Sequence, residues 1–565
     1  MSHQQVPPDA RWFSSYPSGI PHRPDLSGRA VHDMLTDAAR RWPERSAIHF
    51  MGREISYREL DDLVSRAAKG LQTLGVKPGV HVGLYLPNSP HCIIGFMGVL
   101  RAGGVVVNYS PLDAERILEH KIADSETDLI ITVDLQALLP RIAQFMGDSR
   151  LKGLVVGSVA EFAGAPDQLR GQMASAGELS EVPSDGVTPF AALLDNAGDF
   201  QPYPEARAPD SLAVLQYTGG TTGAPKGAML THRSISSAAD QLGAALVTTV
   251  SPGEERILAV LPPFHIYAIM VNMLFGLRDG ATLYQQLRFD PKQALETIQQ
   301  ERITVFPAVP TMLSALLSYP ELENYRLDSL KLCNSGGAPL PVELQQRFRE
   351  RAGCTVKEGW GMTETSTVGT FTPQGMTAPA GSCGVAVPGV DLQILSMDGE
   401  ETVQPPGERG ELCIKGPNMM QGYWKRDDAT AESMTSQGYF RTGDVAFMDE
   451  DGFIYIVDRT KDMIICSGYN VYPRNIEEAI YEHPAVSEVS VIGVPDSYRG
   501  QSPRAYVTIM DGTPHPTLQD MQTFLRSRLG KHEMIQGMEI RDELPKTPVG
   551  KLSKKELYAE VNNQS

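Results

Sequence analysis

The stretch YTGGTTGAPKGAMLTH occupies residues 217–232 and follows the apolar run SLAVLQY (211–217). Its glycines let a backbone approach a ligand closely, its threonine hydroxyls can donate hydrogen bonds, and Lys226 adds a positive charge. A strand that leads into such a turn and then into a helix exposes several backbone N–H groups toward one concavity, which is a common way to bind phosphate. The stretch therefore predicts a phosphate-binding loop between a strand and a helix.

Two alternatives for this loop are weaker. In the P-loop pattern G-x-x-x-x-G-K-[ST], a hydroxyl beside the lysine binds magnesium. Here Lys226 follows Pro225 and precedes Gly227, so that hydroxyl is missing and a P-loop NTPase is disfavoured. A flexible linker is the other alternative, but threonine-rich clusters with a single lysine are not typical of linkers.

The composition limits the class of protein. A chain of 565 residues is long enough for two to four domains. Its net charge of −18 argues against non-specific binding of nucleic acid and against strong attraction to anionic membranes. The six cysteines form no C-x-x-C pair, and the polar start MSHQQVPPDARW contains no apolar signal-peptide core. We expect a cytoplasmic protein without a transmembrane segment.

The first 150 residues alternate between helical and strand patterns. Ser56, with Glu59 three residues later, predicts the start of a helix. A second helix is expected at about 90–101, and the runs HVGLYL, GGVVVNY and DLIITVD predict strands at 81–86, 103–109 and 128–134. This alternation is typical of an α/β domain with largely parallel strands. No repeat of fixed period is visible.

The rest of the chain divides into four stretches. Residues 155–210 are rich in small and polar residues and are interpreted as a surface excursion or linker, and 211–400 again has an α/β pattern. Residues 405–457 predict a small β subdomain. The fold class is therefore α/β, with a large N-terminal domain of layered α/β subdomains and a small β subdomain (1–457), a hinge at 458–461, and a small mobile α+β C-terminal domain (462–565).

Four further motifs contain residues suited to chemistry. GWGMTET (359–365) places the Glu364 carboxylate in a glycine-flanked turn, and magnesium prefers oxygen ligands. PKTPVGKL (545–552) holds Lys551 in a loop that could reach a site built elsewhere. SGGAPL (335–340), taken singly, would be a turn. YFRTGDVAFMDEDGFIYIVDRTKDMI (439–464), taken singly, would contain a turn carboxylate, Asp444, and a solvated basic face with Arg459 and Lys461.

Together these motifs resemble the adenylate-forming superfamily. TGGTTGAPKG matches its phosphate loop, T-[SG]-G-[ST]-T-G-x-P-K-G, and the five motifs follow in the expected order between about residues 28 and 560. The segments 12–26, 108–120 and 458–473 are most similar to bacterial medium- and long-chain fatty acyl-CoA synthetases. The resemblance implies an acid–thiol ligase that forms an acyl-adenylate from ATP and then an acyl-CoA, releasing pyrophosphate and AMP.

The resemblance also implies roles for residues around ATP. Thr218 and Glu364 would hold Mg²⁺, Thr363 would contact the α-phosphate, and Trp360, flanked by Gly359 and Gly361, would lie along the adenine. The loop residues that would hold the phosphates are Thr218, Gly219, Gly220, Thr221, Thr222, Gly223 and Lys226. The residues that would flank the adenine and the acyl pocket are Gly337, Ala338 and Pro339.

Further implied roles concern catalysis and movement. Asp444 would accept the ribose hydroxyls, Arg459 would reach the ribose and the α-phosphate, and Lys461 would be the pivot between the domains. Lys551 would be the catalytic lysine of adenylation, and His265 would lie near the substrate carboxylate. The residues that would line the pantetheine path after domain rotation are Ser467, Gly468 and Tyr469, and the cations considered for the CoA nucleotide are Arg474, Arg499 and Arg504.

The expected ligands are therefore ATP, Mg²⁺, CoA and a small-molecule carboxylic acid, with a fatty acid as the leading substrate class. Aryl acids, dicarboxylic acids and a carrier-protein acceptor stay open as alternatives, as does a non-catalytic nucleotide-binding or acyl-binding protein. Homodimer formation and transient membrane contact also stay open. Some long-chain enzymes carry an aromatic gate where this chain has Ile269.

Overall fold

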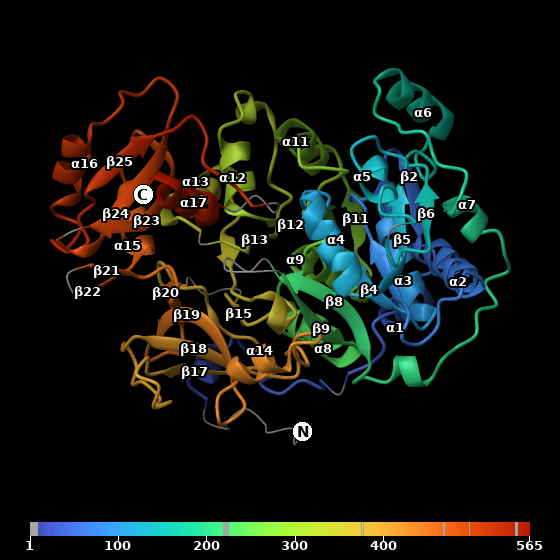
Figure 1. The fold of residues 1–565 in the computed structure, drawn as a ribbon, viewed down its shortest axis with the longest axis horizontal. Coiled ribbons are helices and arrows are strands. Elements are labelled where there is room, and N and C mark those ends of the chain that lie inside the picture. The colour runs from blue at the N-terminus through green and yellow to red at the C-terminus, as the bar shows by residue number, and fades with distance from the viewer. Residues whose placement is uncertain are drawn as a thin grey trace.

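The computed structural model describes residues 10–26, 28–147, 149–218, 225–338, 340–373, 376, 378–466, 469–496, 498–547 and 552–564. Within these ranges the strands form two seven-stranded sheets, a four-stranded sheet, a five-stranded sheet and a two-stranded ladder. Figure 1 shows the C-terminal elements on one side of the molecule and the blue-to-teal elements of the first sheet on the opposite side. The predicted α/β class is confirmed.

The first seven-stranded sheet has the order β7-β6-β5-β3-β4-β8-β9. Its neighbours are parallel except β8 and β9, which form an antiparallel hairpin. The strands predicted at 81–86, 103–109 and 128–134 are confirmed as β3, β4 and β5. The strand bounds are β3 His81–Leu84, β4 Val105–Asn108, β5 Thr127–Val133, β6 Gly153–Gly157, β7 Val187–Pro189, β8 Leu212–Thr218 and β9 Lys226–Thr231.

The second seven-stranded sheet repeats this arrangement, with the order β14-β13-β12-β10-β11-β1-β2. Its neighbours are again parallel except the last pair, β1 and β2. This duplication could not be predicted from the sequence, because the whole first sheet lies between β2 and β10 in the chain. The strand bounds are β1 Ser46–Phe50, β2 Arg53–Ser56, β10 Arg256–Ala259, β11 Thr282–Gln285, β12 Val305–Ala308, β13 Leu332–Ser335 and β14 Val356–Glu358.

Helices connect and cover the two sheets (Figure 1). The Ser56 side chain caps α2 by accepting a hydrogen bond from the Glu59 N–H at 3.1 Å, as predicted. Every residue of α3 is buried, which explains why this segment is apolar on all sides. The helix bounds are η1 Arg11–Ser15, α1 Asp33–Arg41, α2 Tyr57–Thr73, α3 Pro90–Arg101, α4 Glu115–Asp124, α5 Leu139–Ala143, α6 Pro166–Ser175, α7 Phe190–Leu193, η2 Glu205–Arg207, α8 His232–Leu246, α9 Ile266–Ala268, η3 Ile269–Leu274 (a π-helix), α10 Phe275–Arg278, α11 Pro291–Gln300, α12 Pro310–Leu317, η4 Leu322–Asn324, α13 Val342–Ala352 and η5 Thr363–Thr365.

The interpretation of 155–210 as a linker was wrong for much of that stretch. It contains the end of β6, helix α6, the edge strand β7 and helix α7. The side chains of Phe190 and Leu193 in α7 are buried and belong to the main core. A three-residue edge strand and a short helix give almost no periodic signal, which explains the error.

A small antiparallel sheet follows, as predicted. Its order is β17-β18-β19-β20, and it begins at Asp391, earlier than the expected 405. The remaining bounds of this part are β15 Thr370–Phe371, β16 Val385–Ala386, β17 Asp391–Leu395, β18 Gly410–Lys415, α14 Asp427–Glu432, β19 Phe440–Met448 and β20 Ile454–Arg459.

The elements after β20, from β21 to α17 (residues 464–564), are here called the C-terminal unit. Its sheet has the order β22-β21-β24-β23, with β25 also paired to β24, and its core cluster draws its buried residues from 464–535 alone. The mixture of helices and strands expected for this part of the chain is confirmed. Their bounds are β21 Ile464–Cys466, β22 Tyr469–Val471, α15 Pro473–Tyr481, β23 Val486–Asp496, β24 Gly500–Ile509, α16 Leu518–Leu525, β25 Gly537–Ile540 and α17 Lys554–Gln564.

All six cysteines lie within the described residues and are free and buried. Burial raises the pKa of Cys92, Cys383 and Cys413 to about 12 and that of Cys333 well above its ordinary value. These thiols are therefore part of the packed interior and are poor nucleophiles.

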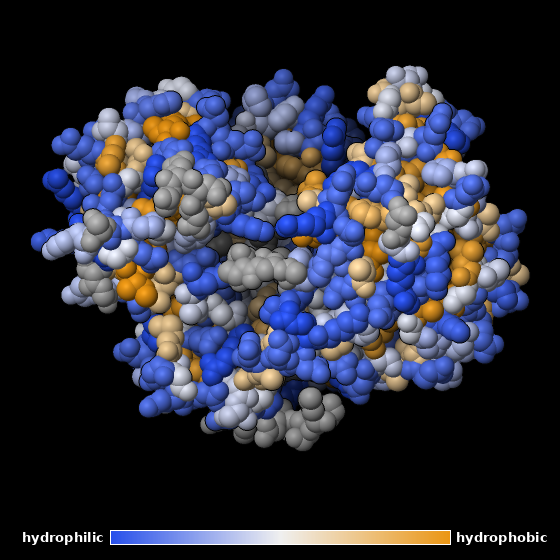
Figure 2. Space-filling view, in the orientation of Figure 1, coloured by the Kyte–Doolittle hydropathy of each residue, from blue (hydrophilic) through white to orange (hydrophobic). Residues whose placement is uncertain are grey.

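The surface is mainly polar on the face shown in Figure 2, where apolar residues occur singly or in small groups. In the part of the chain that the structure describes, no helix has both the length and the apolar character needed to cross a bilayer.

Candidate active site

A cavity of about 1620 Å³ lies between the C-terminal unit and the rest of the chain. It is lined by residues from β8, β9, η5, β19 and β20 on one side and from α15, β23 and α17 on the other. The predicted site residues that line it are Thr218, Lys226, His265, Gly337, Ala338, Gly359, Trp360, Gly361, Thr363, Glu364, Asp444, Arg459 and Lys461. Residues far apart in the sequence are thus brought to one cavity.

The predicted phosphate loop connects two strands and not a strand and a helix. Thr218 is the last residue of β8, and Lys226 is the first residue of β9. The two residues face each other across the hairpin, and Thr218 Oγ1 donates a 3.5 Å hydrogen bond to the Lys226 carbonyl. The helix α8 starts only at His232. The segment KGAMLT (226–231) forms strand β9 because it pairs with β8. This pairing cannot be recognised from the residues of the segment alone. The predicted residues Gly219, Gly220, Thr221, Thr222 and Gly223 lie outside the described residues.

The turn that carries Glu364 is tightly built. Residues 363–365 form η5, and Ser366 and Thr367 follow with φ angles of 49° and 74°. A Cβ atom on Gly361 would lie 1.8 Å from the Thr367 carbonyl oxygen, so only glycine fits there. The Met420 N–H donates a 2.7 Å hydrogen bond to the Glu364 carbonyl, which fixes the turn to a neighbouring segment.

The Glu364 side chain is only 6% exposed and points to a tyrosine. The Tyr423 hydroxyl donates a 2.7 Å hydrogen bond to Glu364 Oε1. Burial raises the pKa of Glu364, and Tyr423, Arg459 and Lys226 act in the opposite direction. A buried carboxylate of this kind is stabilised in its charged form by a bound cation.

The residues at this turn fit magnesium bound together with a nucleotide. No group of three or more histidine, cysteine or acidic side chains suited to a metal occurs among the described residues. Magnesium, however, is usually held by one or two carboxylates together with phosphate oxygens and water. Glu364 and the hydroxyl of Thr218 line the same cavity and are oxygen donors of this type.

The predicted nucleotide side of the cavity is organised around Asp444. The Trp360 indole Nε1–H donates a 2.8 Å hydrogen bond to Asp444 Oδ2, and Arg459 Nε lies 3.2 Å from Oδ1. Asp444 and Arg459 are direct neighbours across β19 and β20. Burial raises the pKa of Asp444, and the Arg459 guanidinium opposes this shift. Two donors therefore fix the orientation of a carboxylate that can accept hydroxyl groups from a ligand.

We expect Asp444→Asn to raise the KM for ATP about tenfold or more, with a smaller change in kcat. The reason is that the two charge-assisted hydrogen bonds expected between this carboxylate and the ribose hydroxyls would be weakened. Asp391→Asn is a matched control, because Asp391, like Asp444, accepts a hydrogen bond from an aromatic side chain (Tyr439, 2.5 Å) but does not line the cavity. Steady-state kinetics with varied ATP test the prediction, and an unchanged KM would contradict the assignment of Asp444.

The predicted acyl side contains His265 as a helix cap. Its Nδ1 accepts a 3.2 Å hydrogen bond from the Tyr267 N–H at the start of α9. Tyr267, which the sequence did not single out, also lines the cavity, and its hydroxyl accepts a 2.7 Å hydrogen bond from Asn334 Nδ2. A Cβ on Gly336 would lie 2.7 Å from the Tyr267 ring, so this glycine lets the aromatic ring pack against the SGGAPL turn. Pro339 lies outside the described residues.

The C-terminal unit contributes the segments beside Lys551. Thr547 and Leu552 line the cavity, whereas Lys551 itself lies outside the described residues. Tyr469 is 62% exposed and does not line the cavity. Its ring packs against His532 with the ring centroids 5.2 Å apart. Ser467 and Gly468, the other residues expected on the pantetheine path, also lie outside the described residues.

The surroundings of Arg474 argue against its predicted role in binding the CoA nucleotide. Its guanidinium is buried, donating to the Ile456 carbonyl at 2.6 Å and to Glu478 at 3.0 Å. It also lies near Glu358, whose pKa is raised by burial to about 7, against the opposing effect of this arginine. Arg474 therefore joins the C-terminal unit to β20 and is not part of a basic surface patch.

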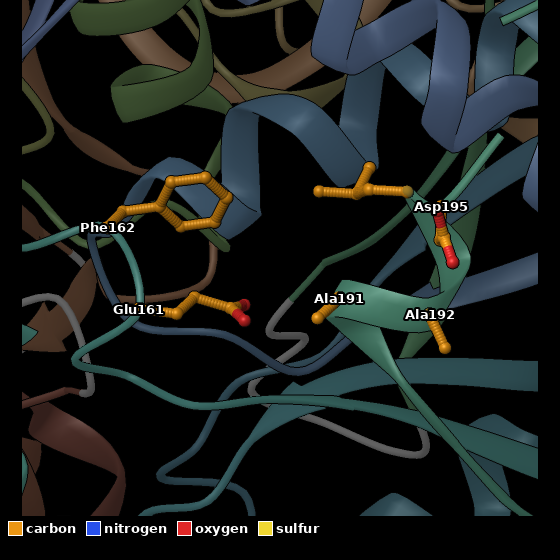
Figure 3. Close-up of a pocket in the computed structure, with 6 residues that line it drawn as sticks. Glu161, Phe162, Ala191, Ala192 and Asp195 are labelled. Carbon is orange, nitrogen blue, oxygen red and sulfur yellow. The ribbon is translucent and has the colours of Figure 1, made fainter. Parts of the chain in front are cut away.

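A second, shallower depression of about 640 Å³ lies between the segment after β6 and helix α7 (Figure 3). In Figure 3 the carboxylate of Glu161 points toward Ala191, and Asp195 follows at the end of α7. The Glu161 carboxylate is hydrogen-bonded to Nε2 of the buried His91 ring. None of the predicted site residues lines this depression, so it is separate from the site described above.

Known families match both parts of the chain. The family described as AMP-binding enzyme matches residues 35–424. The chain belongs to the AMP-binding enzyme family. The family described as AMP-binding enzyme C-terminal domain matches residues 475–551, which lie within the C-terminal unit. The superfamily resemblance deduced from the motifs is confirmed.

Individual relatives of this AMP-binding enzyme align over almost the whole chain. A long-chain-fatty-acid–CoA ligase of Bacillus subtilis (strain 168) is 38% identical over 555 residues, covering 97% of this chain and 98% of that protein. A feruloyl-CoA synthase of Amycolatopsis sp is 35% identical over 520 residues, covering 92% and 96%. The crystal structure of ATP-bound MatB from Rhodopseudomonas palustris superposes with a TM-score of 0.79 at 27% identity, covering 94% and 98%.

Proposed function

We propose that this AMP-binding enzyme is an ATP-dependent fatty acyl-CoA synthetase that forms an acyl-adenylate and then an acyl-CoA. The observation that carries the proposal is the single cavity at which Lys226, Glu364, Asp444 and the segments beside Lys551 meet. The full-length similarity to long-chain-fatty-acid–CoA ligases at 38% identity supports the fatty acid as substrate.

In the first half-reaction the substrate carboxylate attacks the α-phosphate of ATP and pyrophosphate leaves. Such a step requires alignment and neutralisation of charge more than covalent help from the protein. Lys226 and the loop it closes hold the departing pyrophosphate, Asp444 holds the ribose, and Thr363 contacts the α-phosphate. Lys551 bridges the carboxylate and the α-phosphate as negative charge develops. Glu364 and Thr218 would hold the magnesium ion, which would supply further neutralisation of the phosphate charge.

In the second half-reaction a thiol attacks the acyl carbon, the bond to the phosphate breaks and AMP leaves, and the C-terminal unit moves to admit the thiol. We assign residues 1–457 to the adenylation domain, 458–461 to the hinge and 462–565 to the mobile domain. The separate core of the C-terminal unit supports this division. So does the turn directly after β20, in which the Asp462 N–H donates to the Arg459 carbonyl at 3.0 Å. Rotation about Lys461 withdraws Lys551 and brings Ser467, Gly468 and Tyr469 to the cavity.

The exposed position of Tyr469 is consistent with a structure poised for the first half-reaction. In this arrangement the segments on both sides of Lys551 line the cavity, whereas Tyr469 lies in solvent. The pantetheine path is then formed only after rotation, which separates the two reactions in time at one site.

A second substrate class is supported by a specific observation. The feruloyl-CoA synthase of Amycolatopsis sp is 35% identical over 92% of this chain, close to the value for the fatty-acid ligases. An aromatic acid is therefore the alternative to a fatty acid, with the same adenylate chemistry.

The experiment that distinguishes them is acid-dependent ATP–pyrophosphate exchange with acetate, medium- and long-chain fatty acids, dicarboxylates and hydroxycinnamates. Each active acid is then supplied with CoA, and the acyl-CoA is measured by mass spectrometry. We expect exchange to be greatest with fatty acids and to lead to acyl-CoA. Greatest exchange with hydroxycinnamates would favour the aryl alternative, exchange without acyl-CoA would indicate a carrier-protein acceptor, and no exchange with any acid would overturn the proposal.

A further inference from the structure

Tyr423 occupies the junction between the predicted phosphate hairpin and the turn that carries Glu364. It is 6% exposed, lines the cavity, and was not singled out by any sequence motif. Its two ends contact two different parts of the site. The hydroxyl donates to Glu364 Oε1 at 2.7 Å, and the ammonium of Lys226 lies over the ring, 4.5 Å from its centroid.

The backbone around Tyr423 is fixed to the hairpin. The Met229 N–H donates to the Gly422 carbonyl at 2.9 Å, and the Trp424 N–H donates to the Gly227 carbonyl at 2.8 Å. The Tyr423 N–H in turn donates to Thr430 Oγ1 at 2.9 Å. The segment that holds Tyr423 therefore forms an antiparallel β-bridge to β9, between Tyr423 and Ala228, which ties the tyrosine to the strand that begins at Lys226.

This geometry orients a carboxylate. A glutamate side chain can rotate about its terminal bond and exchange its two oxygens. The hydrogen bond from Tyr423 holds Oε1 and thereby directs the other oxygen, Oε2, to a different partner. Groups that hydrogen-bond to a metal-binding carboxylate commonly fix its orientation, and their removal weakens metal binding by about 10- to 100-fold.

We infer that Tyr423 is a positioning residue that holds Glu364 in the orientation needed to bind the magnesium of Mg·ATP. It also couples this orientation to the hairpin, because the same ring contacts Lys226. The inference rests on the proposed function, in which Glu364 and Thr218 hold the metal.

The test is Tyr423→Phe, which removes the hydroxyl but keeps the ring over Lys226. We expect the Mg²⁺ concentration for half-maximal ATP–pyrophosphate exchange to rise about tenfold. At saturating Mg²⁺, kcat should stay within about threefold of the wild-type value, because Glu364 is still present and the excess metal compensates for the lost orientation.

A direct binding measurement gives a readout that does not depend on turnover. Mn²⁺ binding to the enzyme with α,β-methylene-ATP, followed by electron paramagnetic resonance, should weaken by a similar factor in Tyr423→Phe. In a Glu364→Ala background, which removes the acceptor of the Tyr423 hydrogen bond, Tyr423→Phe should have little further effect on Mn²⁺ affinity, since the two residues act through one interaction.

Tyr439→Phe is a matched control. Tyr439 is also a buried tyrosine that donates to a carboxylate, at 2.5 Å from Asp391 Oδ2, but it does not line the cavity. It should match Tyr423→Phe in any loss of thermal stability while leaving the Mg²⁺ requirement unchanged.

The outcomes separate this inference from the proposed function. An unchanged Mg²⁺ requirement and Mn²⁺ affinity in Tyr423→Phe, with an active wild-type enzyme, would overturn the inference alone. An equal rise in the Mg²⁺ requirement in Tyr439→Phe would assign the effect to stability and would also overturn it. A wild-type protein that shows no exchange with any acid would overturn the proposed function, whereas the Mn²⁺ measurement would still decide the role of Tyr423.

Discussion

Lys551→Ala is expected to lower acid-dependent ATP–pyrophosphate exchange by about 100- to 1000-fold. A preorganised donor that contacts developing charge in a transition state typically contributes this much. Formation of acyl-CoA from supplied acyl-adenylate should stay within about threefold of the wild-type rate, because the proposed rotation removes Lys551 from the cavity before the thiol attacks. Single-turnover measurements of the two half-reactions test the prediction.

Lys531→Ala is the control for this variant, because Lys531 is an exposed lysine of the same C-terminal unit that does not line the cavity. It should affect neither half-reaction. Equal losses in both half-reactions of Lys551→Ala would contradict the proposed division of labour between the two orientations of the C-terminal unit.

Glu364→Gln is expected to lower ATP–pyrophosphate exchange about 100-fold at physiological Mg²⁺. The substitution retains an oxygen that can accept the hydrogen bond from Tyr423 but removes the charge that attracts the metal. A hundredfold change corresponds to about 3 kcal/mol of transition-state stabilisation. The measurement is the exchange rate as a function of Mg²⁺ concentration.

Excess Mg²⁺ is expected to distinguish Glu364→Gln from Lys551→Ala. It should partly restore Glu364→Gln, because weaker metal binding can be compensated by concentration, but it should not restore Lys551→Ala. If Glu364→Gln kept its full rate and the wild-type Mg²⁺ requirement, Glu364 would not be a metal ligand, and the role inferred for Tyr423 would also fail.

Much of the local structure could be predicted because it has local causes. Ser56 with Glu59 predicted a helix start, the pattern at about 90–101 predicted a second helix, and both are observed. The duplication of the sheets could not be predicted, because β1 pairs with β11, more than two hundred residues later. Such pairing depends on which surfaces remain to be covered after the first sheet has formed, and no short pattern encodes it.

Some residues of the site could likewise be predicted from the sequence, and others could not. Motifs rich in glycine, threonine and charge identified Glu364, Asp444 and Lys226 by resemblance, and the structure places all three at one cavity. Tyr423 and Tyr267 were missed, since the sequence does not distinguish a tyrosine whose hydroxyl contacts a site residue from one that only packs in the core. The partner of Tyr423 is 59 residues away in the chain.

The burial of every cysteine has a practical consequence for observing the C-terminal unit. Thiol-reactive dyes require an exposed thiolate, so native residues such as Cys92 and Cys383 should label slowly in the folded protein. A cysteine introduced at Val247, which is 52% exposed near the end of α8, and another at Lys531 would then be the preferred labelling sites. The protein is therefore suitable for fluorescence distance measurements of the proposed domain rotation without prior replacement of its native cysteines.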